Sequence, residues 1–428
     1  MRELLDWTHE EDWETSNVDR IDSIIGIDDL VDAALIGQDA KPMPTGTDAG
    51  LLESPRPQSV YKHAILEQYV VRFATMTASK LKPKRAVLFD GFAGRGRFDT
   101  GEGGSAEQMM LAAQKAKSAT QIDLLLIEKN RQDYESLDAV ADEYRARGIR
   151  IDSHHGECGD YIDGALQLAV GASLFVFLDP CGAVLPMSSI RNILRTRGKW
   201  PRTELLLNFS ADLIRRAGGQ LKKGQLDLGG VAKADAVCGG QWWRGVALRS
   251  HEASGGRDWE SAAENVAIEY AKHLTDGTGY GYVVAPVRRQ VHHQPVYYLI
   301  FLTQDPHGFW VFGAAAAKAR QRWIEFLGPD PNEPQGTLWD AVADQFEREQ
   351  TQAIAHITEN LRRLTADGQP KEVVRNVKAV YSDLYGEAKE TAYTAAVRAL
   401  VKSGEIEHVT KVSKPHQHVI RKTTAPSP

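Results

Sequence analysis

The sequence predicts an α/β fold in which helices cover both faces of a largely parallel sheet. Five short apolar runs alternate with helical patterns, and a glycine-rich turn follows the first run. The runs are residues 86–90, 122–128, 149–152, 174–179 and 204–209. Continuously apolar strands are typical of parallel strands that are buried on both faces. Their regular alternation with helices is typical of βαβ units.

Helical periodicity fills most of the intervals between these runs. The predicted helices are residues 60–75, 105–118, 131–147, 160–170, 188–197, 262–274 and 314–327. Ser105 with Gln108 predicts a capping box at the start of the second helix. The Gly-rich segment 218–256, with Trp242 beside Trp243, breaks the pattern and is predicted to be an insertion, either near the site or a mobile surface loop.

Two further strands are predicted to close the sheet. Residues 280–291 and 296–303 can pair as a hairpin, which suits the antiparallel end of a seven-stranded sheet. The second of them is expected to turn through DPHG into residues 309–312.

The turn after the first strand carries the first candidate site. In RAVLFDGFAGRGRF, residues 85–98, the strand ends at Asp90 and Gly91, Gly94 and Gly96 follow. Glycine permits positive φ angles and close approach of the backbone to a nucleotide-like ligand. The spacing D-x-F-x-G-x-G favours S-adenosylmethionine over a dinucleotide, and a plain strand-to-helix turn is the alternative. The candidate cofactor-binding residues here are Asp90, Phe92, Gly94 and Gly96.

Four acidic residues follow consecutive predicted strands, at the sheet edge where open α/β sheets bind ligands. They are Asp90, Glu128, Glu157 and Asp179. Glu128 is placed to accept both ribose hydroxyls of a nucleoside. Glu157, or the backbone of Cys158, is placed to bind the adenine amine. Asp160 is the rival for that role, but its setting is more typical of a helix start.

The segment FLDPCGA contains the candidate substrate-side acid, Asp179. In exocyclic-amine methyltransferases a [D/N]-P-P-[Y/F] segment holds the amine, and its aromatic residue stacks on the flipped base. This chain keeps Asp179 and Pro180 but has Cys181 and Gly182 in place of the second proline and the aromatic. We therefore expect acceptance of an N–H or O–H proton near the methyl group, without base stacking by this loop.

The C-terminal region predicts a separate domain at residues 336–428. Helices at 353–364, 373–384 and 390–401 are followed by two strands around a turn, which is the order of a winged helix. The third helix would enter the major groove, with Tyr393, Arg398 and Lys402 as candidate nucleic-acid contacts. Winged helices also dock proteins, so that alternative stays open.

Composition separates the two ends of the 428-residue chain. Residues 1–60 hold 14 acidic and 4 basic residues, whereas residues 351–428 hold 12 basic and 8 acidic ones. Only the tail therefore suits a polyanionic partner. Three distant cysteines, no long apolar run and an acidic N-terminus predict a cytoplasmic protein without a membrane segment. Adjacent histidines (154–155 and 292–293) point to opposite faces of a strand, so no metal site is assigned.

The ordered motifs resemble the three-Cys-motif partner protein (TcmP) family. They are KHAILEQYV, LFDGFAGRGRF with GGS, LLLIE, FVFLDPCG, ELLLNFSADLIRR and YYLIFLTQDPHGFW. The resemblance covers residues 60–428 and includes the C-terminal winged helix, whereas residues 1–56 form an acidic arm without a counterpart. It implies a Rossmann-like class I methyltransferase domain at 57–330, S-adenosylmethionine as cofactor, and pairing with a radical-SAM-like protein bearing three cysteines.

The resemblance also implies roles for residues outside the cofactor loop. Lys62 and His63 match the opening Lys-His of the family and are candidate catalytic residues with Asp179. His63 would be a proton acceptor, unless the pair is a helix start facing water. The candidates for lining the acceptor pocket are Pro180, Asn208, Phe209, Ser210 and Arg215. Arg215 with Arg216 would suit a phosphate, and Arg95 or Arg97 is expected to face the cofactor carboxylate or a substrate phosphate.

The leading hypothesis is an S-adenosylmethionine-dependent methyltransferase that acts on a nucleic acid or nucleotide-like acceptor. Two alternatives come from other classes. One is a non-catalytic DNA-binding or regulatory protein that keeps the fold. The other is an accessory subunit of the radical-SAM-like partner.

Overall fold

The computed structural model describes residues 56–180, 185–226, 229–290, 293–327, 338–410 and 412–423. These residues fall into two compact units, one ending at Gln352 and the other beginning at Ala353. The predicted arm, apart from Arg56, lies outside the described residues. Residues 328–337, Cys181 and Gly182 lie outside them too.

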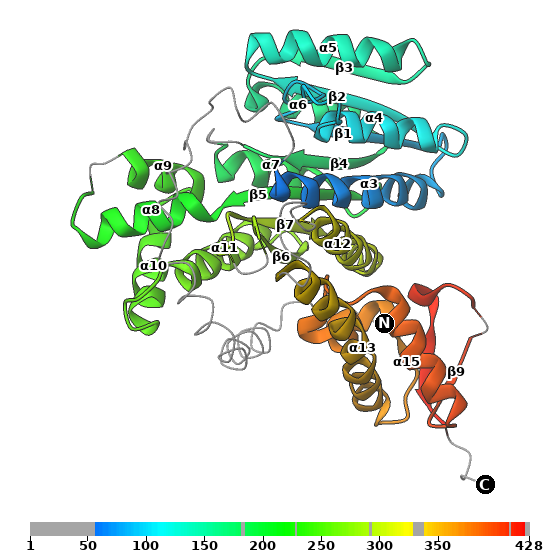
Figure 1. Ribbon diagram of the computed structural model, residues 1–428. Coiled ribbons are helices and arrows are strands. Elements are labelled where there is room, and N and C mark those ends of the chain that lie inside the picture. Colours follow the sequence, from blue (N-terminus) through cyan, green and yellow to red (C-terminus); the bar gives the residue numbers. More distant parts are fainter. Residues whose placement is uncertain are drawn as a thin grey trace. The chain divides into compact units, whose positions relative to one another are not determined.

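The first unit is built on a seven-stranded sheet of order β3-β2-β1-β4-β5-β7-β6 (Figure 1). Its strands are β1 (Arg85–Asp90), β2 (Gln121–Glu128), β3 (Arg150–His155), β4 (Ser173–Leu178), β5 (Thr203–Ser210), β6 (Gly281–Val287) and β7 (Tyr297–Thr303). Strands β1 to β5 pair in parallel, and β7 is antiparallel to both of its neighbours. The predicted hairpin is thus confirmed. This order with one reversed strand is the Rossmann-like methyltransferase fold.

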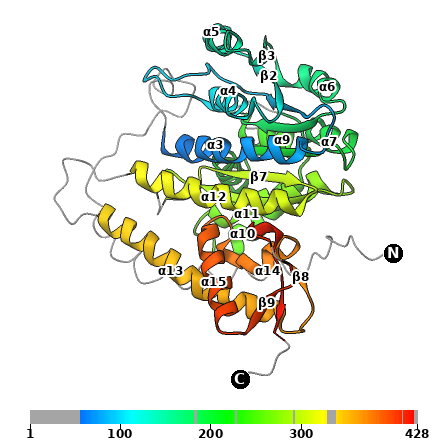
Figure 2. The same ribbon diagram turned by 90° about the vertical axis from the view of Figure 1, so that its right-hand side faces the viewer.

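Helices cover both faces of the sheet, as the apolar strands predicted. One face carries α3 (Pro57–Ala78), α4 (Ser105–Ala116), α5 (Arg131–Arg145) and α12 (Pro306–Leu327). The other carries α6 (Cys158–Leu168), α7 (Met187–Thr196) and α11 (Glu260–Thr275). Helices α3 and α12 lie side by side in both views (Figure 2).

Aromatic packing holds α3 against the sheet. The Tyr69 ring of α3 lies 5.8 Å from Phe175 of β4 and 5.2 Å from Phe301 of β7, centroid to centroid. Its hydroxyl donates to the buried carboxylate of Glu204, which also accepts from Thr303 Oγ1 at 2.9 Å. Burial raises the pKa of Glu204 to about 7 although both hydrogen bonds oppose the shift. This anchored helix carries Lys62 and His63.

Two helix starts differ from the prediction. Gly104, not Ser105, is the N-cap of α4, because the Ser105 hydroxyl donates to Asp90 Oδ2 at 2.9 Å instead of capping the helix. Helix α12 begins at Pro306, so residues 309–312 are helical rather than the continuation of a turn. Proline fits there because the first turn of a helix needs no donor from its nitrogen.

The predicted insertion at 218–256 is largely helical, which corrects the expectation of a broken pattern. It contains the end of α8 (Ala211–Lys222), then α9 (Gly229–Cys238) and α10 (Trp242–Ala253). Trp243 is fully buried and its Nε1 donates to Asp235 Oδ1 at 2.9 Å. The glycines of this segment made it look like a loop in the sequence, but at Gly218 glycine is required by packing. There α8 lies so close to Trp259 that a Cβ would come within 2.5 Å of its ring.

The second unit follows the predicted order only in part, because an unpredicted strand at residues 371–372 precedes the second helix and the predicted helix 373–384 is divided into three short pieces. Its elements are α13 (Leu338–Thr365), which begins before the unit boundary, β8 (Lys371–Glu372), η3 (Val373–Asn376), α14 (Val377–Tyr381), η4 (Ser382–Leu384), α15 (Glu390–Lys402), β9 (Ile406–His408), η5 (Pro415–Gln417) and β10 (Val419–Lys422). A small antiparallel sheet of order β8-β10-β9 joins them.

We expect Gly218→Ala to destabilise the first unit by about 1–3 kcal/mol, because the new methyl group would overlap Trp259. The thermal midpoint should fall by at least about 2 °C. Gly219→Ala is the matched control, since a Cβ there meets no atom within 4 Å and alanine favours the helix. Equal midpoints for the two variants would contradict the packing of α8 against Trp259.

Candidate active site

Asp90 begins the candidate site at the end of β1. Its side chain is fully buried, accepts from the Phe92 amide at Oδ1 (3.0 Å) and accepts from the Ser105 hydroxyl at Oδ2 (2.9 Å). Burial raises the pKa of Asp90 to about 7, against the effect of both hydrogen bonds. Asp90 thereby fixes the start of the loop.

The glycines of this loop are required by its geometry. Gly94 and Gly96 have φ values of +62° and +79°, which L side chains rarely adopt. Gly91 has no such angle, but a Cβ there would lie 2.4 Å from the Cys158 sulfur. Its amide donates to Phe177 O at 3.1 Å, so β4 also holds the loop.

Glu128, at the end of β2, turns toward the glycine loop. Its Oε2 accepts from the Gly94 amide at 2.9 Å and its Oε1 accepts from the Asn130 amide at 2.6 Å. Burial raises the pKa of the Glu128 carboxyl, and the amide hydrogen bonds oppose that shift. The structure thus brings Glu128 to the loop, as the order of elements predicted.

The residues after β3 are placed differently from one another. Glu157 precedes α6, is 55% exposed and lies 2.6 Å from Lys129 Nζ in an ion pair. Cys158 is buried beneath Gly91, and burial raises the pKa of its thiol to about 12. Asp160 lies in the first turn of α6, which agrees with its interpretation as a helix-start residue.

Three candidates from distant parts of the chain meet at the carboxyl end of β4. Asp179 accepts from Lys62 Nζ at Oδ2 and from Asn208 Nδ2 at Oδ1. Leu178 of β4 pairs with Leu207 of β5, so the residues that follow them are neighbours. Helix α3 supplies Lys62, whose ammonium also lies 5.9 Å from the Phe177 ring centroid.

Asp179 and the adjacent His63 are each held in one protonation state near neutral pH. Burial alone would raise the pKa of Asp179, but the Lys62 charge and the hydrogen bonds from Lys62 and Asn208 outweigh it and lower that pKa. Burial and the adjacent Lys62 lower the pKa of His63 to about 3. Asp179 is therefore ionised and His63 is neutral, which makes His63 a weak proton acceptor.

The two loop arginines are engaged in ion pairs. Arg95 pairs with Asp99 at 2.9 Å and with Asp133 at 3.5 Å. Arg97 pairs with Glu107 and, at 3.1 Å, with Glu143. These carboxylates come from the loop and from α4 and α5, so both guanidinium groups brace the loop rather than stand free beside it.

A cavity of about 570 Å³ lies beside the strand ends. Its lining includes Pro180, Asn208, Phe209 and Ser210, which are candidates for the acceptor pocket, and Arg216, which was expected with Arg215 to suit a phosphate. Arg215 is not in its lining, because the Arg215 guanidinium donates to Pro295 O at 2.7 Å and to Asp212. Phe92, a candidate cofactor-binding residue, is partly buried and packs against the apolar core.

The lining also contains residues that the sequence analysis missed. They are the cations Lys233 and Arg289 and the amides Gln58 and Gln220. Arg289 follows β6, which runs parallel to β5, so its position after a strand at the same sheet edge was an available signal. Lys233 lies on α9, within the segment that was predicted to be an insertion.

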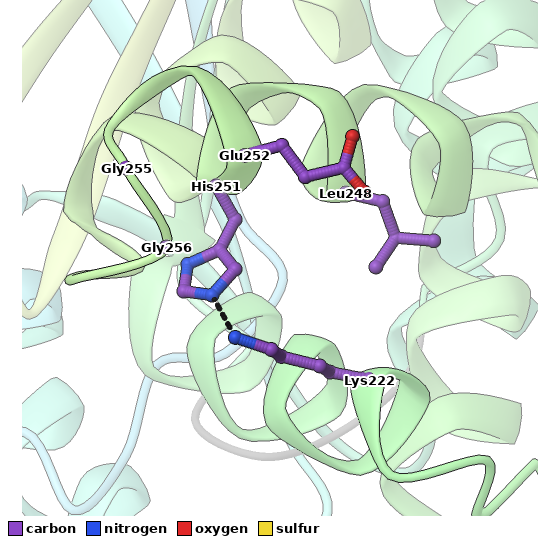
Figure 3. Close-up of a pocket in the computed structure, with 6 residues that line it drawn as sticks. All are labelled: Lys222, Leu248, His251, Glu252, Gly255 and Gly256. Atoms are coloured by element: carbon purple, nitrogen blue, oxygen red, sulfur yellow. Dashed lines mark hydrogen bonds between the residues drawn. The ribbon is translucent and has the colours of Figure 1, made fainter.

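A second cavity, of about 410 Å³, lies between α8 and α10 (Figure 3). There Lys222 Nζ lies 2.9 Å from His251 Nε2, and His251 Nδ1 lies 2.5 Å from Asp258 O. Because a carbonyl only accepts, Nδ1 carries the proton and Nε2 accepts from the ammonium. The His251 ring stacks on the Trp259 ring with their centroids 3.9 Å apart. The Lys222–His251 contact therefore joins α8 to α10, both of which lie in the segment that was predicted to be an insertion.

The described residues contain neither a candidate metal-ion cluster nor a helix suited to cross a membrane. No group of three or more His, Cys, Asp and Glu in the described ranges could hold a metal ion. Within the same part of the chain, every helix is too short or too polar to cross a membrane.

Comparison with solved structures gives distant likenesses. The plantazolicin methyltransferase BamL, solved with a desmethylPZN analog and SAH, is 12% identical over 57% of this chain and 84% of its own, with a TM-score of 0.29. An rRNA methylase from Streptococcus thermophilus is 11% identical over 55% of this chain and 95% of its own, with a TM-score of 0.28. A precorrin-6y C5,15-methyltransferase from Geobacter metallireducens is 15% identical over 54% of this chain and 86% of its own, with a TM-score of 0.25.

No protein-family model and no curated protein matches the sequence. TM-scores of this size carry no argument about activity, so the fold assignment rests on the strand order itself.

We expect Lys62→Met to destabilise the first unit by about 3–5 kcal/mol at pH 8, because it leaves the Asp179 carboxylate buried without its cation. In the wild type the lowered pKa of Asp179 contributes stability above its unfolded pKa, which is lost as the pH falls. In the variant burial dominates and raises that pKa, so the loss should be smaller at pH 4.5 than at pH 8.

Thermal unfolding at the two pH values measures this difference. Lys115→Met is the matched control, since its ammonium makes a half-exposed pair with Glu67 at 3.4 Å that contributes under about 1 kcal/mol. Adding Asp179→Asn to Lys62→Met should restore much of the stability. The same loss at both pH values, with no recovery in the double variant, would refute the ion-pair account.

Proposed function

We propose that the protein is an S-adenosylmethionine-dependent methyltransferase acting on a nucleic acid or nucleotide-like acceptor. The observation that carries this proposal is the hydrogen bond from the Gly94 amide to the Glu128 carboxylate at 2.9 Å. It sets a ribose-binding acid beside a glycine loop at the carboxyl edge of the sheet, where such folds bind nucleosides. The loop fits a close ligand, since a Cβ at Gly94 would meet no atom within 4 Å.

Each part of the cofactor has candidate partners in the chain. Main-chain groups of the loop at Gly94 and Gly96 would hold the methionine part, and Glu128 the ribose hydroxyls. Glu157 or the backbone of Cys158, at the start of α6, would bind the adenine amine. When bound, the sulfonium supplies an electrophilic methyl group.

On the acceptor side, the chain's own residues supply positioning. The ionised Asp179 carboxylate accepts a hydrogen bond from the acceptor N–H or O–H, using a lone pair left over by Lys62 and Asn208. The lowered pKa of Asp179 makes it an orienting group and a weak base. Holding the nucleophile in line is therefore its main contribution.

Titration calorimetry with S-adenosylmethionine tests the proposal directly. We expect the wild type to bind and Glu128→Gln to bind at least about 10-fold more weakly, because a hydrogen bond to a charged group contributes about 1.5–3 kcal/mol. Glu135→Gln, an exposed acid on α5, is the control and should bind like the wild type. Absence of binding heat in the wild type, or Asp90→Ala binding as the wild type does, would remove the proposal.

We also propose that residues 353–423 form a winged helix that contacts nucleic acid. The order of α13, α14 and α15, followed by the β9–β10 pair, supports it. Arg398 and Lys402 are exposed on α15, as groove or phosphate contacts require. Tyr393 is excluded from the contact set, because it is fully buried and its hydroxyl lies 3.0 Å from His418 Nδ1.

The double variant Arg398→Gln/Lys402→Gln tests this second function. We expect weaker binding of a labelled 20-base-pair duplex in fluorescence anisotropy, with a salt slope smaller by about 2, since each phosphate contact contributes about 1. Arg363→Gln on α13, an exposed arginine of the same unit, is the control. Failure of the wild type to bind duplex at low salt would exclude DNA contact by this unit.

Membership of the TcmP family, and pairing with its radical-SAM-like three-cysteine protein, are proposals supported by the motifs quoted above. The competing function is a regulatory protein that binds DNA without transferring a methyl group. Duplex binding together with no S-adenosylmethionine binding would favour that competitor.

A further inference from the structure

The cavity beside Asp179 has one region at the strand ends and another along α8, with apolar side chains between them. Pro180 and Asn208 line it at the strand ends, where the acceptor nucleophile is expected. From there the lining follows α8 from Ser210 to Gln220, ten residues or about 15 Å of helix. Apolar side chains such as Leu207, Leu213 and Tyr270 form much of the wall between.

Cations predominate among the charged lining residues. Arg216 of α8, Lys233 of α9 and Arg289 after β6 line the cavity, and the one carboxylate among the described lining residues is Asp212. Asp212 is already neutralised, because its Oδ1 accepts from the Arg215 guanidinium. Arg216 and Arg289 therefore bring positive charge to the cavity that no carboxylate among the described lining residues balances.

Buried polar atoms without partners mark the same cavity. Arg289 Nε, Gln58 Oε1 and Gln220 Oε1 are each buried with no hydrogen-bond partner among the described residues. An arginine nitrogen can only donate, so Arg289 requires an acceptor atom. An unpaired buried donor is costly, and a native structure with such a group calls for a partner of matching chemistry.

Resting on the proposed function, we propose that the methyl acceptor carries an anionic head group, a phosphate or carboxylate, which binds to Arg289, Arg216 and Lys233. Guanidinium groups suit both anions because they donate paired N–H bonds to two oxygens. The volume of about 570 Å³ suits a single small molecule or one nucleotide with an apolar or aromatic body. The neutral end of that body then lies toward Asn208 and Asp179.

Titration calorimetry on the full chain, without S-adenosylmethionine, tests this inference with three probes that share one ring: phenyl phosphate, benzoate and benzyl alcohol. Ionic strength is held constant because salt screens the cations. We expect one or both anions to bind at least about 10-fold more tightly than benzyl alcohol. The tighter anion identifies the head group as phosphate or carboxylate.

Variants locate the binding. Arg289→Gln and Arg216→Gln should each reduce anion binding at least about 5-fold, and Arg289→Lys should retain part of it. Arg72→Gln, an exposed arginine of α3 outside the cavity, should leave it unchanged. Arg216 is exposed, so its variant remains informative if the Arg289 variants fail to fold.

Two results would overturn the inference: anions that bind no better than benzyl alcohol, or cavity variants that bind like Arg72→Gln. A parallel titration with S-adenosylmethionine separates the two proposals. Cofactor binding without anion preference overturns the head-group assignment alone. Anion preference without cofactor binding overturns the methyltransferase proposal and keeps the anion site.

Discussion

In-register pairing of three parallel strands is the constraint on which the candidate site depends. Asp90 of β1 pairs with Leu126 of β2 and with Phe177 of β4. Glu128 and Asp179 each stand two residues beyond those partners, so they flank the loop that follows Asp90. A slip of one residue in either pairing would turn the side chain to the opposite face.

The three carboxylates at this edge are stabilised in different ways, although all lose water. Asp90 is fully buried with only neutral hydrogen-bond donors, and its pKa rises to about 7. Glu128 is partly open and bonded to two amides, and burial raises its pKa. Asp179 has a cation in contact, and its pKa falls. Lys62 therefore favours the ionised form of Asp179, on the side of the loop assigned to the acceptor.

Much of the fold could be predicted from the sequence because the strands are short, continuously apolar and bounded by polar residues. The closing hairpin and the helix order of the second unit followed from the same kind of pattern. The segment 218–256 could not be predicted in this way. Its glycines are required by close packing, as at Gly218 against Trp259, and a glycine placed for packing looks like a loop residue in sequence.

Site residues that directly follow strands could be predicted from the sequence. The contacts made by residues on helices and in the loop could not. Lys62 was a candidate only through its family motif, since its contact with Asp179 joins residues 117 apart. Arg95 and Arg97 looked like ligand-binding cations because their partners on α4 and α5 are distant in sequence. Local pattern carries no information about which carboxylate a long side chain will reach.

The reversed strand links the topology to the chemistry of the cavity. Because β7 is antiparallel to β5 and to β6, the carboxyl end of β6 returns to the edge where β4 and β5 end. Arg289 follows β6 and so reaches the same cavity as Asn208, which lies near the end of β5. With β6 in the opposite direction, this arginine would lie at the far edge of the sheet. The strand order that defines the fold thus also places a cation and the Asp179 cluster around one cavity.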